Sequence, residues 1–217
     1  SFVPHFYKKI PFDPVKDFTP VAQVGRSGNL LLVGKDLPAN TLKEFVAYAK
    51  AHPNKLNYCS WGNGSGGHLT MESLQKQAGL TMTHVAYKGS TPCVQDLMGG
   101  HVPFMFDGPA NTVPMIRSGK IRAFAVSSPK RNPALPDVPT FKESGFDFEA
   151  ESWVGFFVPA KTSPAVIERL NTWINEVMSD PASREHLTKL GLRLSPRNAA
   201  ESQAYLKAEV AKWATMV

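Results

Sequence analysis

One stretch decides the fold class of this 217-residue chain: Ser60-Trp61-Gly62-Asn63-Gly64-Ser65-Gly66-Gly67-His68-Leu69-Thr70. The apolar residues before it, Leu56–Cys59, predict a strand, and the residues His68–Ala78 predict a helix. A helix N-terminus offers unpaired N–H groups and a partial positive charge. Glycines let a ligand approach the backbone closely. This stretch therefore predicts an anion site in an α/β protein.

The spacing of the glycines leaves three kinds of anion open. Gly62, Gly64 and Gly67 match a dinucleotide-binding fingerprint, but the next strand ends in Ala86-Tyr87-Lys88 and supplies no acid for a ribose. The same spacing fits a phosphate loop, but the Lys and Ser/Thr that must follow are absent. A carboxylate needs only N–H groups and a hydroxyl, which Ser60 and Ser65 can supply. We favour a carboxylate, and an NAD(P)-binding oxidoreductase domain with Lys88 facing a 2′-phosphate is the alternative.

Outward from this loop, the pattern of strand, turn and helix repeats. Gly79, Gly99 and Gly119 lie just past the expected helix ends, where a left-handed residue is favoured. Alternation of this kind predicts a mainly parallel sheet covered by helices. The further strands are expected at Thr83–Ala86, Pro103–Phe106 and Arg122–Val126, and the further helices at Pro92–Met98 and Asn111–Arg117.

Two more polar segments follow strands of this predicted sheet. Tyr87-Lys88-Gly89-Ser90 lies between a strand and a helix, so Ser90 and the free N–H groups repeat the anion-binding arrangement. Lys88 is either a ligand contact or a solvated surface lysine. Asp107 ends a strand and is either a hydrogen-bond acceptor for a ligand amine, hydroxyl or bound water, or the N-cap of the next helix.

The flanking regions predict a second set of elements. Strands are expected at Val21–Arg26, Leu30–Val33 and Ser152–Pro159, and Thr41 with Glu44 forms a capping box. The Pro-rich segment Ser128–Gly145 is interpreted as a surface excursion with one short helix. Two long helices are expected near the C-terminus. The first starts at Ser163-Pro164 with the core face Val166, Ile167, Leu170, Ile174 and Val177; the second starts at Asn198 and buries Leu206, Val210 and Trp213.

Composition and motif spacing argue against several functions. The net charge is +6, but the basic residues are scattered, so we expect no nucleic-acid binding. His68 with Ser60 or Ser65 is the best nucleophile–base set, and no nucleophile-elbow motif supports it. No metal-ligand spacing is present. From these absences together we expect no catalysis, no metal and no cofactor. Cys59 and Cys93 match no redox motif; we favour two separate buried thiols over a disulfide.

Several segments resemble the Bug (TctC-like) family of solute-binding proteins. The resemblance covers essentially the whole chain and is specific as an ordered set of motifs. The matching segments are Lys9–Ala22, Lys55–Leu69, His84–Gly89, Asp96–Gly100, Phe106-Asp107, Gly119–Val126 with Arg131 and Pro133–Thr140, and Trp153 with Gly155–Pro159.

The resemblance implies a periplasmic-binding-protein-like clamp of two α/β domains. Domain one would be 1–26 with 151–217, and domain two 27–150. Such a protein captures a small carboxylate, such as a dicarboxylate, an amino acid or an aromatic acid, in the periplasm for a tripartite tricarboxylate transporter or a sensor. By this resemblance, the ligand-facing residues are Ser60, Trp61, Gly62, Asn63, Gly64, Ser65, Gly66, Gly67, His68, Tyr87, Lys88, Gly89, Ser90 and Asp107.

The chain departs from the family's pattern in two ways. The family's first strand, loop and helix are not matched, so we expect domain one to be incomplete, to self-associate or to belong to a longer protein, and to leave ligand binding weak. Val21–Arg26 and Trp153–Pro159 are expected to pair in its sheet. Trp61 stands where a small residue is usual, and stacks on a flat ligand or fills the pocket. A module kept only for protein interactions is a third hypothesis.

Overall fold

The computed structural model describes residues 10–216, with side chains up to residue 211, as two compact units. Unit 1 takes the described residues up to Arg26, then Trp153–Lys189 and Arg193 onward. Unit 2 takes Ser27–Ser152 and Leu190–Leu192. No helix in the described part of the chain is long and apolar enough to cross a membrane.

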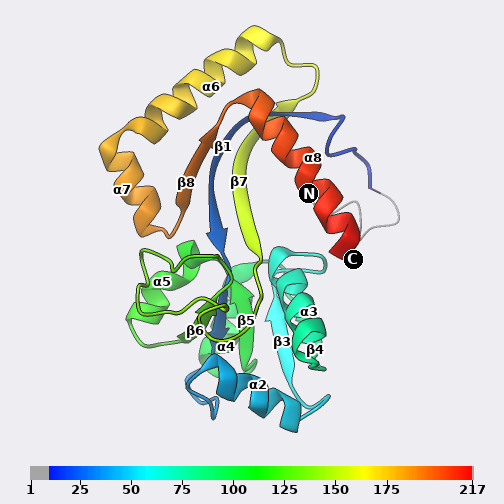
Figure 1. Cartoon of the computed structure of the whole chain (residues 1–217), viewed down its shortest axis with the longest axis vertical. Helices are drawn as coiled ribbons and strands as arrows, with labels where there is room; N and C mark the ends of the chain where they lie inside the picture. Colours follow the sequence, from blue (N-terminus) through cyan, green and yellow to red (C-terminus); the bar gives the residue numbers. More distant parts are fainter. Residues whose placement is uncertain (1–9, 217) are drawn as a thin grey trace. The chain divides into compact units, whose positions relative to one another are not determined.

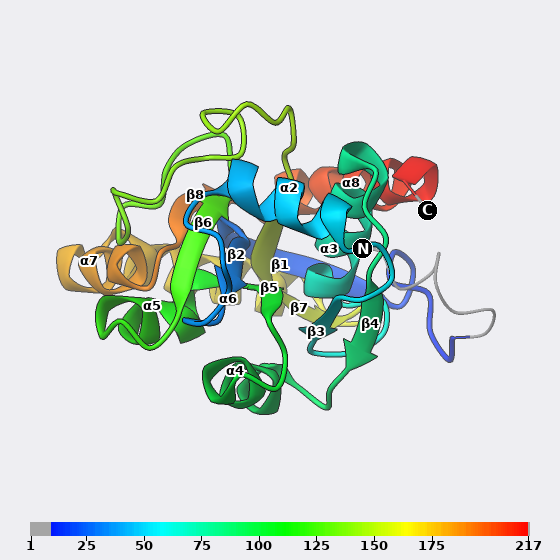
Figure 2. The ribbon, with the colours of Figure 1, turned by 90° about the horizontal axis from the view of Figure 1, so that it is seen from below.

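Unit 2 is built on a five-stranded sheet with the order β4-β3-β5-β2-β6 (Figures 1 and 2). Its strands are β2 (Leu30–Val33), β3 (Asn57–Ser60), β4 (Thr83–Ala86), β5 (Phe104–Asp107) and β6 (Arg122–Val126). β3 is parallel to β4 and to β5, whereas β2 is antiparallel to β5 and β6. Four strands thus share one direction, as the alternating pattern predicts, and β2 is the exception.

Alternate residues of these strands feed two apolar layers. Leu31 and Phe106 lie in one layer, together with helices α2 (Leu42–Ala51) and α3 (Gly66–Ala78). Leu32 and Met105 lie in the other, with α4 (Ser90–Gly99) and α5 (Pro109–Arg117). Figure 2 shows these helix pairs on opposite faces of the sheet. Because successive side chains of a strand point to opposite faces, a sheet buried on both sides reads as continuous apolar runs.

The helix ends follow the capping signals of the sequence. The Thr41 hydroxyl accepts from the Glu44 N–H at 3.2 Å, and the Ser65 hydroxyl accepts from the His68 N–H at 3.3 Å. Gly79 and Gly100 end α3 and α4 in the left-handed conformation, with φ of 64° and 77°. Helix α4 ends one residue later than predicted, because Gly99 is its last residue.

The segment between β6 and β7 (Glu151–Pro159) differs from the prediction. It contains turns and no helix, and it is not merely a surface excursion, because Phe141 and Phe148 are buried in the core. Phe141 N–H donates to the Val126 carbonyl at 3.2 Å, so this segment is fixed to the end of β6. The prolines indicated a loop, but their spacing carried no information about which aromatic side chains return to the core.

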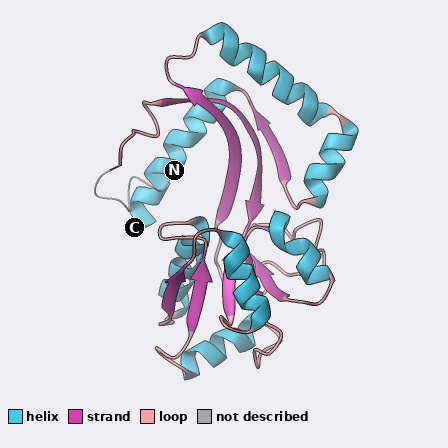
Figure 3. Ribbon diagram, turned by 180° about the vertical axis from the view of Figure 1, so that it is seen from behind, coloured by secondary structure: helices cyan, strands magenta, loops and turns pink. Residues whose placement is uncertain are grey.

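Unit 1 contains a three-stranded sheet with the order β7-β1-β8 (Figures 1 and 3). β1 is Phe18–Gly28, β8 is Arg193–Arg197, and these two strands are antiparallel. The predicted pairing of Val21–Arg26 with Trp153–Pro159 is confirmed by the neighbouring positions of β1 and β7. β8 was not predicted. Gly25 is required in β1, since a Cβ there would lie 2.8 Å from the Arg193 carbonyl oxygen.

The described part of unit 1 also contains the helices α6 (Pro164–Ser179), α7 (Pro181–Lys189) and α8 (Ala199–Met216). The predicted core face of α6 is wrong in part, because Val166 and Val177 are 47% and 59% exposed. Met178 is the buried residue, and the Asn171 amide donates to the Val21 carbonyl at 2.7 Å. The inward face is therefore rotated by about one residue from the predicted one.

The start of α8 agrees with the prediction. The Asn198 side chain accepts from the Glu201 N–H at 2.9 Å, and the Glu201 carboxylate accepts from the Asn198 N–H at 3.1 Å. This reciprocal pair is a capping box. Leu206 is buried and Val210 is half-buried, whereas the Trp213 side chain lies outside the described residues.

Candidate functional site

Three predicted site segments meet at one edge of the unit 2 sheet. Ser60 and Ala86 are paired residues at the ends of β3 and β4, and the Tyr87 N–H donates to the Ser60 carbonyl at 2.9 Å. Asp107 ends β5 on the other side of β3. Parallel strands end at the same edge, so a ligand in an open α/β sheet binds where these segments gather.

The glycine loop is held together by its own hydrogen bonds. The Ser60 hydroxyl donates to the Gly62 carbonyl at 3.0 Å and accepts from the Gly62 N–H at 3.2 Å. The Gly64 N–H donates to His68 Nδ1 at 3.1 Å. The backbone amides of Gly62 and Gly64 are thus used within the loop, and they shape it rather than face a ligand.

The N–H groups left for a ligand are at the first turn of α3. Ser65 is the N-cap, and its hydroxyl and carbonyl accept the N–H groups of His68 and Leu69. Gly66 and Gly67 are the first two helical residues, whose N–H groups no helical carbonyl can accept. The partial positive charge of the helix N-terminus lies at these same amides.

The Trp61 indole packs against this first turn. A Cβ added to Gly67 would lie 2.4 Å from the indole and 2.7 Å from the Phe106 carbonyl oxygen. A Cβ on Gly66 would lie 3.4 Å from the indole, an ordinary contact. Gly67 is therefore a glycine for steric reasons. The indole forms a flat wall beside the two helical amides.

The residues of the second segment, Tyr87–Ser90, differ in their contacts and exposure. The Tyr87 hydroxyl donates to Asp96 of α4, which raises the pKa of Tyr87. Lys88 and Asn63 are exposed. Gly89 is the N-cap of α4 with φ of 112° and forms no side-chain cap, and Ser90 is the first helical residue.

Asp107 is a buried carboxylate beside this second segment. Its side chain accepts from the Ser90 hydroxyl and, at 2.7 Å, from the Gly108 N–H. Burial raises the pKa of Asp107, and these two hydrogen bonds oppose the rise. Gly108, not Asp107, is the N-cap of α5. Asp107 thus faces the same strand ends as the glycine loop, as a hydrogen-bond acceptor.

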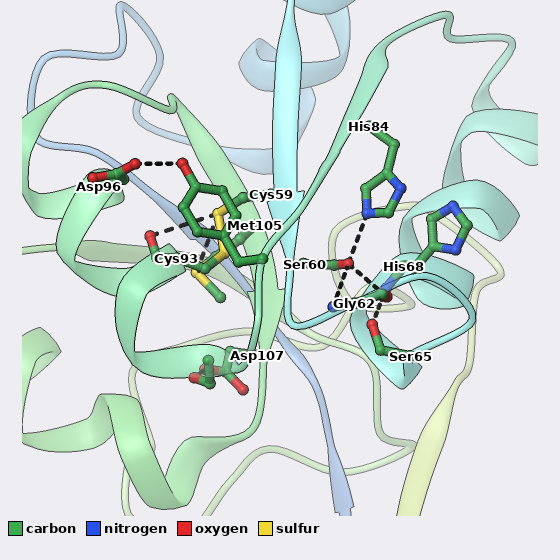
Figure 4. The surroundings of a disulfide bond; sticks show 12 residues. Cys59, Ser60, Gly62, Ser65, His68, His84, Cys93, Asp96, Met105 and Asp107 are labelled. Carbon is green, nitrogen blue, oxygen red and sulfur yellow. Dashed lines mark hydrogen bonds between the residues drawn. A yellow bond between two sulfur atoms is a disulfide. The ribbon is translucent and has the colours of Figure 1, made fainter.

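Our preference for two separate thiols is wrong, because Cys59 and Cys93 form a disulfide (Figure 4). Both residues are fully buried, and their Cα atoms lie 5.9 Å apart. Cys59 points into the layer that α4 covers, which places it against the first turn of that helix. The bond joins the strand before the glycine loop to the helix that begins at Ser90.

Sequence reasoning missed a polar network behind the first turn of α3. The Asn29 amide donates to the Thr70 hydroxyl at 3.0 Å, and Thr70 donates to the Gly66 carbonyl at 2.6 Å. The Ser152 hydroxyl lies 3.4 Å from the Asn29 side-chain oxygen. Asn29 and Thr70 are both buried. The only signal in the sequence was a polar residue between two apolar strand segments.

His84 of β4 was also missed. Its Nε2 lies 2.7 Å from the Ser60 hydroxyl, and its ring stacks on that of His68 with centroids 3.9 Å apart. Burial lowers the pKa of both rings, and the neighbouring His68 helps to lower that of His84 to about 4. Ser60 is fully buried, so its hydroxyl supports the loop and is not exposed for attack on a substrate.

No group of three or more possible metal ligands occurs among residues 10–216. The carboxylates of Asp107 and Glu72 each accept a hydrogen bond from a hydroxyl group. The arrangement at this edge offers helix amides, a hydroxyl-bonded carboxylate and an aromatic wall. Helix amides of this kind can hold a small anion.

Comparison with known proteins shows the family of this chain. The family model described as "Tripartite tricarboxylate transporter family receptor" matches residues 1–217. The structure of the periplasmic binding protein BugD superposes with a TM-score of 0.94 at 33% identity, covering 100% of this chain and 73% of that one. The fold is therefore that of the Bug/TctC periplasmic binding proteins, a class of solute-binding receptors. This chain belongs to the tripartite tricarboxylate transporter receptor family.

Two further solved structures carry ligands. The R. palustris protein Rpa4515 with adipate has a TM-score of 0.94 and 32% identity, covering 97% of this chain and 71% of that one. MatC from Rhodopseudomonas palustris with bound malate has a TM-score of 0.89 and 30% identity, covering 97% and 73%. The chain spans 62–64% of the length of three curated relatives from Cupriavidus necator, a Pseudomonas strain and Bordetella pertussis, to which it is 32–36% identical.

Proposed function

We propose that this chain captures a small dicarboxylate and that unit 2 is its carboxylate-binding domain. The observation that carries the proposal is the first turn of α3, where the Gly66 and Gly67 amides lie at the strand ends beside Trp61. Adipate and malate in the two related structures support a ligand with two carboxylates.

In this proposal, one carboxylate of the ligand accepts hydrogen bonds from the amides of Gly66 and Gly67. A hydrogen bond to a charged group contributes about 1.5–3 kcal/mol. Each amide therefore accounts for a factor of roughly 10 to 150 in affinity, because 1.4 kcal/mol is tenfold. Trp61 covers one side of the ligand with an apolar surface.

Asp107 gives the proposed site a preference among dicarboxylates. A buried carboxylate repels a ligand carboxylate and accepts a hydrogen bond from a hydroxyl or an amine. Ser90 donates to Asp107 and has lone pairs left to accept from the same ligand. We therefore propose that ligands with a hydroxyl or amine beside the carboxylate, such as malate, bind better than unsubstituted ones.

The family supports a proposal for the partner and the compartment. We propose that the chain delivers its ligand to the membrane subunits of a tripartite tricarboxylate transporter or to a sensor, and that it works in the periplasm. The Cys59–Cys93 disulfide supports an oxidising compartment. Ligand uptake by cells with and without the gene tests the transport role, since a receptor for a transporter raises uptake.

A matched pair of variants at Gly66 tests the anion site. Gly66→Pro removes the first helical N–H, and proline fits the first position of a helix. Ser65, with φ −71° and ψ 161°, already has the conformation that precedes a proline. Gly66→Ala adds a Cβ and keeps the N–H. Calorimetry with malate and adipate should show at least tenfold weaker binding for the proline variant and little change for the alanine variant.

Two results would contradict the proposal. Equal binding of dicarboxylates by the proline and alanine variants would show that the amide does not contact the ligand. The second result would be detected by NMR at millimolar ligand, with no response to the acids themselves. Binding of NAD(P) would then favour a nucleotide ligand, and binding of the diamides of these acids would favour a neutral ligand.

A further inference from the structure

Behind the glycine loop, three aromatic rings form a stacked column. The His68 and His84 rings are 3.9 Å apart with an interplanar angle of 14°, and Tyr58 stacks on His84 at 5.0 Å. Tyr58 is in β3, His84 in β4 and His68 in the first turn of α3. The column therefore touches each of the elements that enter or leave the loop.

Each imidazole contacts one residue of the loop, and Figure 4 shows the contact of His84 with Ser60. His68 Nδ1 accepts the Gly64 N–H directly, at 3.1 Å. His84 Nε2 contacts the Ser60 hydroxyl at 2.7 Å, and that hydroxyl bonds both the N–H and the carbonyl of Gly62. Gly62 and Gly64 have φ of 139° and 68°, conformations that only glycine adopts readily. The rings thus fix the two points at which the loop backbone is unusual.

The far side of the column is anchored by Glu72 of α3. The Tyr58 hydroxyl donates to its carboxylate, and the Gln75 amide donates to the same oxygen at 2.9 Å. His68 Nε2 lies 3.8 Å from that oxygen. His68 therefore presents Nε2 to a carboxylate and Nδ1 to the loop.

The protonation state of His68 decides whether the loop bond exists. Nδ1 accepts a hydrogen bond only while it carries no proton. A proton added to His68 goes to Nδ1, because Nε2 already carries one in this tautomer. It would set a donor against the Gly64 N–H, and the bond would be lost. The added charge is balanced by Glu72, so the ligand gains no compensating attraction from it.

We propose that His68 and His84 are positioning residues of the ligand site: His84 supports the glycine loop by donating its Nε2–H to Ser60, and His68 holds the loop in its binding shape only while its imidazole is neutral. The proposal rests on the proposed function for its ligand readout alone. Burial lowers the pKa of both rings, the coulombic effect of His68 lowers that of His84 further, and Glu72 opposes both shifts. The loop is therefore held at neutral pH and released in acid.

The groups that face the two rings come from three elements. Tyr58 of β3 stacks on them, and burial together with its bond to Glu72 raises its pKa, so it stays neutral throughout the acidic range. Glu72 of α3 is the charged group beside His68. The two histidines, from α3 and β4, are the groups that gain charge as the pH falls.

A ligand-independent measurement tests the loop claim first. In NMR spectra recorded from pH 8 downward, the Gly64 amide resonance should shift with the same midpoint as the His68 ring, because the two share a hydrogen bond. If the Gly64 amide stays unchanged while the His68 ring titrates, His68 does not hold the loop. This result is independent of whether a dicarboxylate binds.

Variants with a matched control test the role in binding. His68→Asn places an amide oxygen near the position of Nδ1 and cannot gain a charge, so it should keep neutral-pH affinity for malate and lose the fall in acid. His68→Leu should bind about ten times more weakly than wild type at neutral pH, by loss of the loop bond, and should show no further fall in acid. His101→Asn, at an exposed histidine in a turn, should retain the wild-type pH profile.

The same design covers His84. His84→Gln keeps an N–H near Nε2 for Ser60 and should retain affinity, whereas His84→Leu should not. Equal affinities and pH profiles for wild type, His68→Asn and His68→Leu would overturn the proposal. Failure of Gly66→Pro to change binding, with normal behaviour of the histidine variants, would instead refute the anion site alone.

Discussion

Reduction of the Cys59–Cys93 disulfide should cost unit 2 about 4 kcal/mol of unfolding free energy. The two residues are separated by 34 positions. Closing a loop of that length in the unfolded chain removes entropy of about 12–13 cal/mol/K, or roughly 4 kcal/mol at 25 °C, in the chain-entropy description. The loop includes the end of β3, all of α3 and β4, and therefore most of the proposed site.

The bond is buried, so reduction requires unfolding in denaturant with a reductant and refolding with the reductant present. Hydrogen exchange followed by mass spectrometry on peptides from β3 and β5 reports the opening of unit 2 separately from unit 1. Protection in the oxidised chain should exceed that in the reduced chain by roughly three powers of ten, the equivalent of about 4 kcal/mol.

The Cys59→Ala/Cys93→Ala double variant is the control for this measurement. It should resemble the reduced chain and show no further change with reductant. A difference below about 1 kcal/mol between oxidised and reduced chains would refute the reasoning, since it would mean that the unfolded loop is already compact.

Three further outcomes follow from the structure. Because the folded pKa of His84, about 4, is below the usual 6.5, its stabilising contribution is complete above pH 6.5 and is lost as the pH falls toward 4. Solvent screening of this half-buried ring reduces the loss of unfolding free energy to about 1 kcal/mol. Urea unfolding at several pH values, with His84→Gln as the control, should show this loss. Gly67→Ala should destabilise unit 2 by about 1–3 kcal/mol, because the added Cβ meets the Trp61 indole and the Phe106 carbonyl oxygen. Gly66→Ala should destabilise it much less in the same denaturation experiment. Equal losses of unfolding free energy would contradict the packing argument. Trp173 and Val177 are 49% and 59% exposed on α6. We therefore predict that sedimentation velocity shows concentration-dependent self-association, and that the double variant Trp173→Glu/Val177→Glu abolishes it. An unchanged sedimentation coefficient at all concentrations would show that this face does not associate.

Local structure was largely determined by the sequence alone. β4 and β6 have the predicted bounds, and the caps at Thr41 and Asn198 were readable because each involves residues only three positions apart. The convergence of the Ser60, Ser90 and Asp107 segments followed from one general rule, that parallel strands end at one edge. These features depend on short-range chemistry or on topology.

Other features were decided only by the tertiary structure. β2 runs opposite to its neighbours because Leu30, its first residue, pairs with the last residues of β5 and β6. A four-residue apolar strand carries no signal of its direction. The face of α6 that is buried was misjudged because apolar residues occupy two adjacent stripes, and contacts with β1 select between them.

The site shows the same division. The sequence supplied the glycines and a helix just after them, so it predicted an anion site there by pattern, whereas the N-cap Ser65 and the helix start at Gly66 came from the structure. It did not show that the Gly62 and Gly64 amides are occupied by Ser60 and His68, nor that His84 stands behind them. The partners of Cys59 were also hidden. Each of these contacts joins residues whose approach depends on how β3, β4 and α4 pack, and packing distances are not encoded in local periodicity.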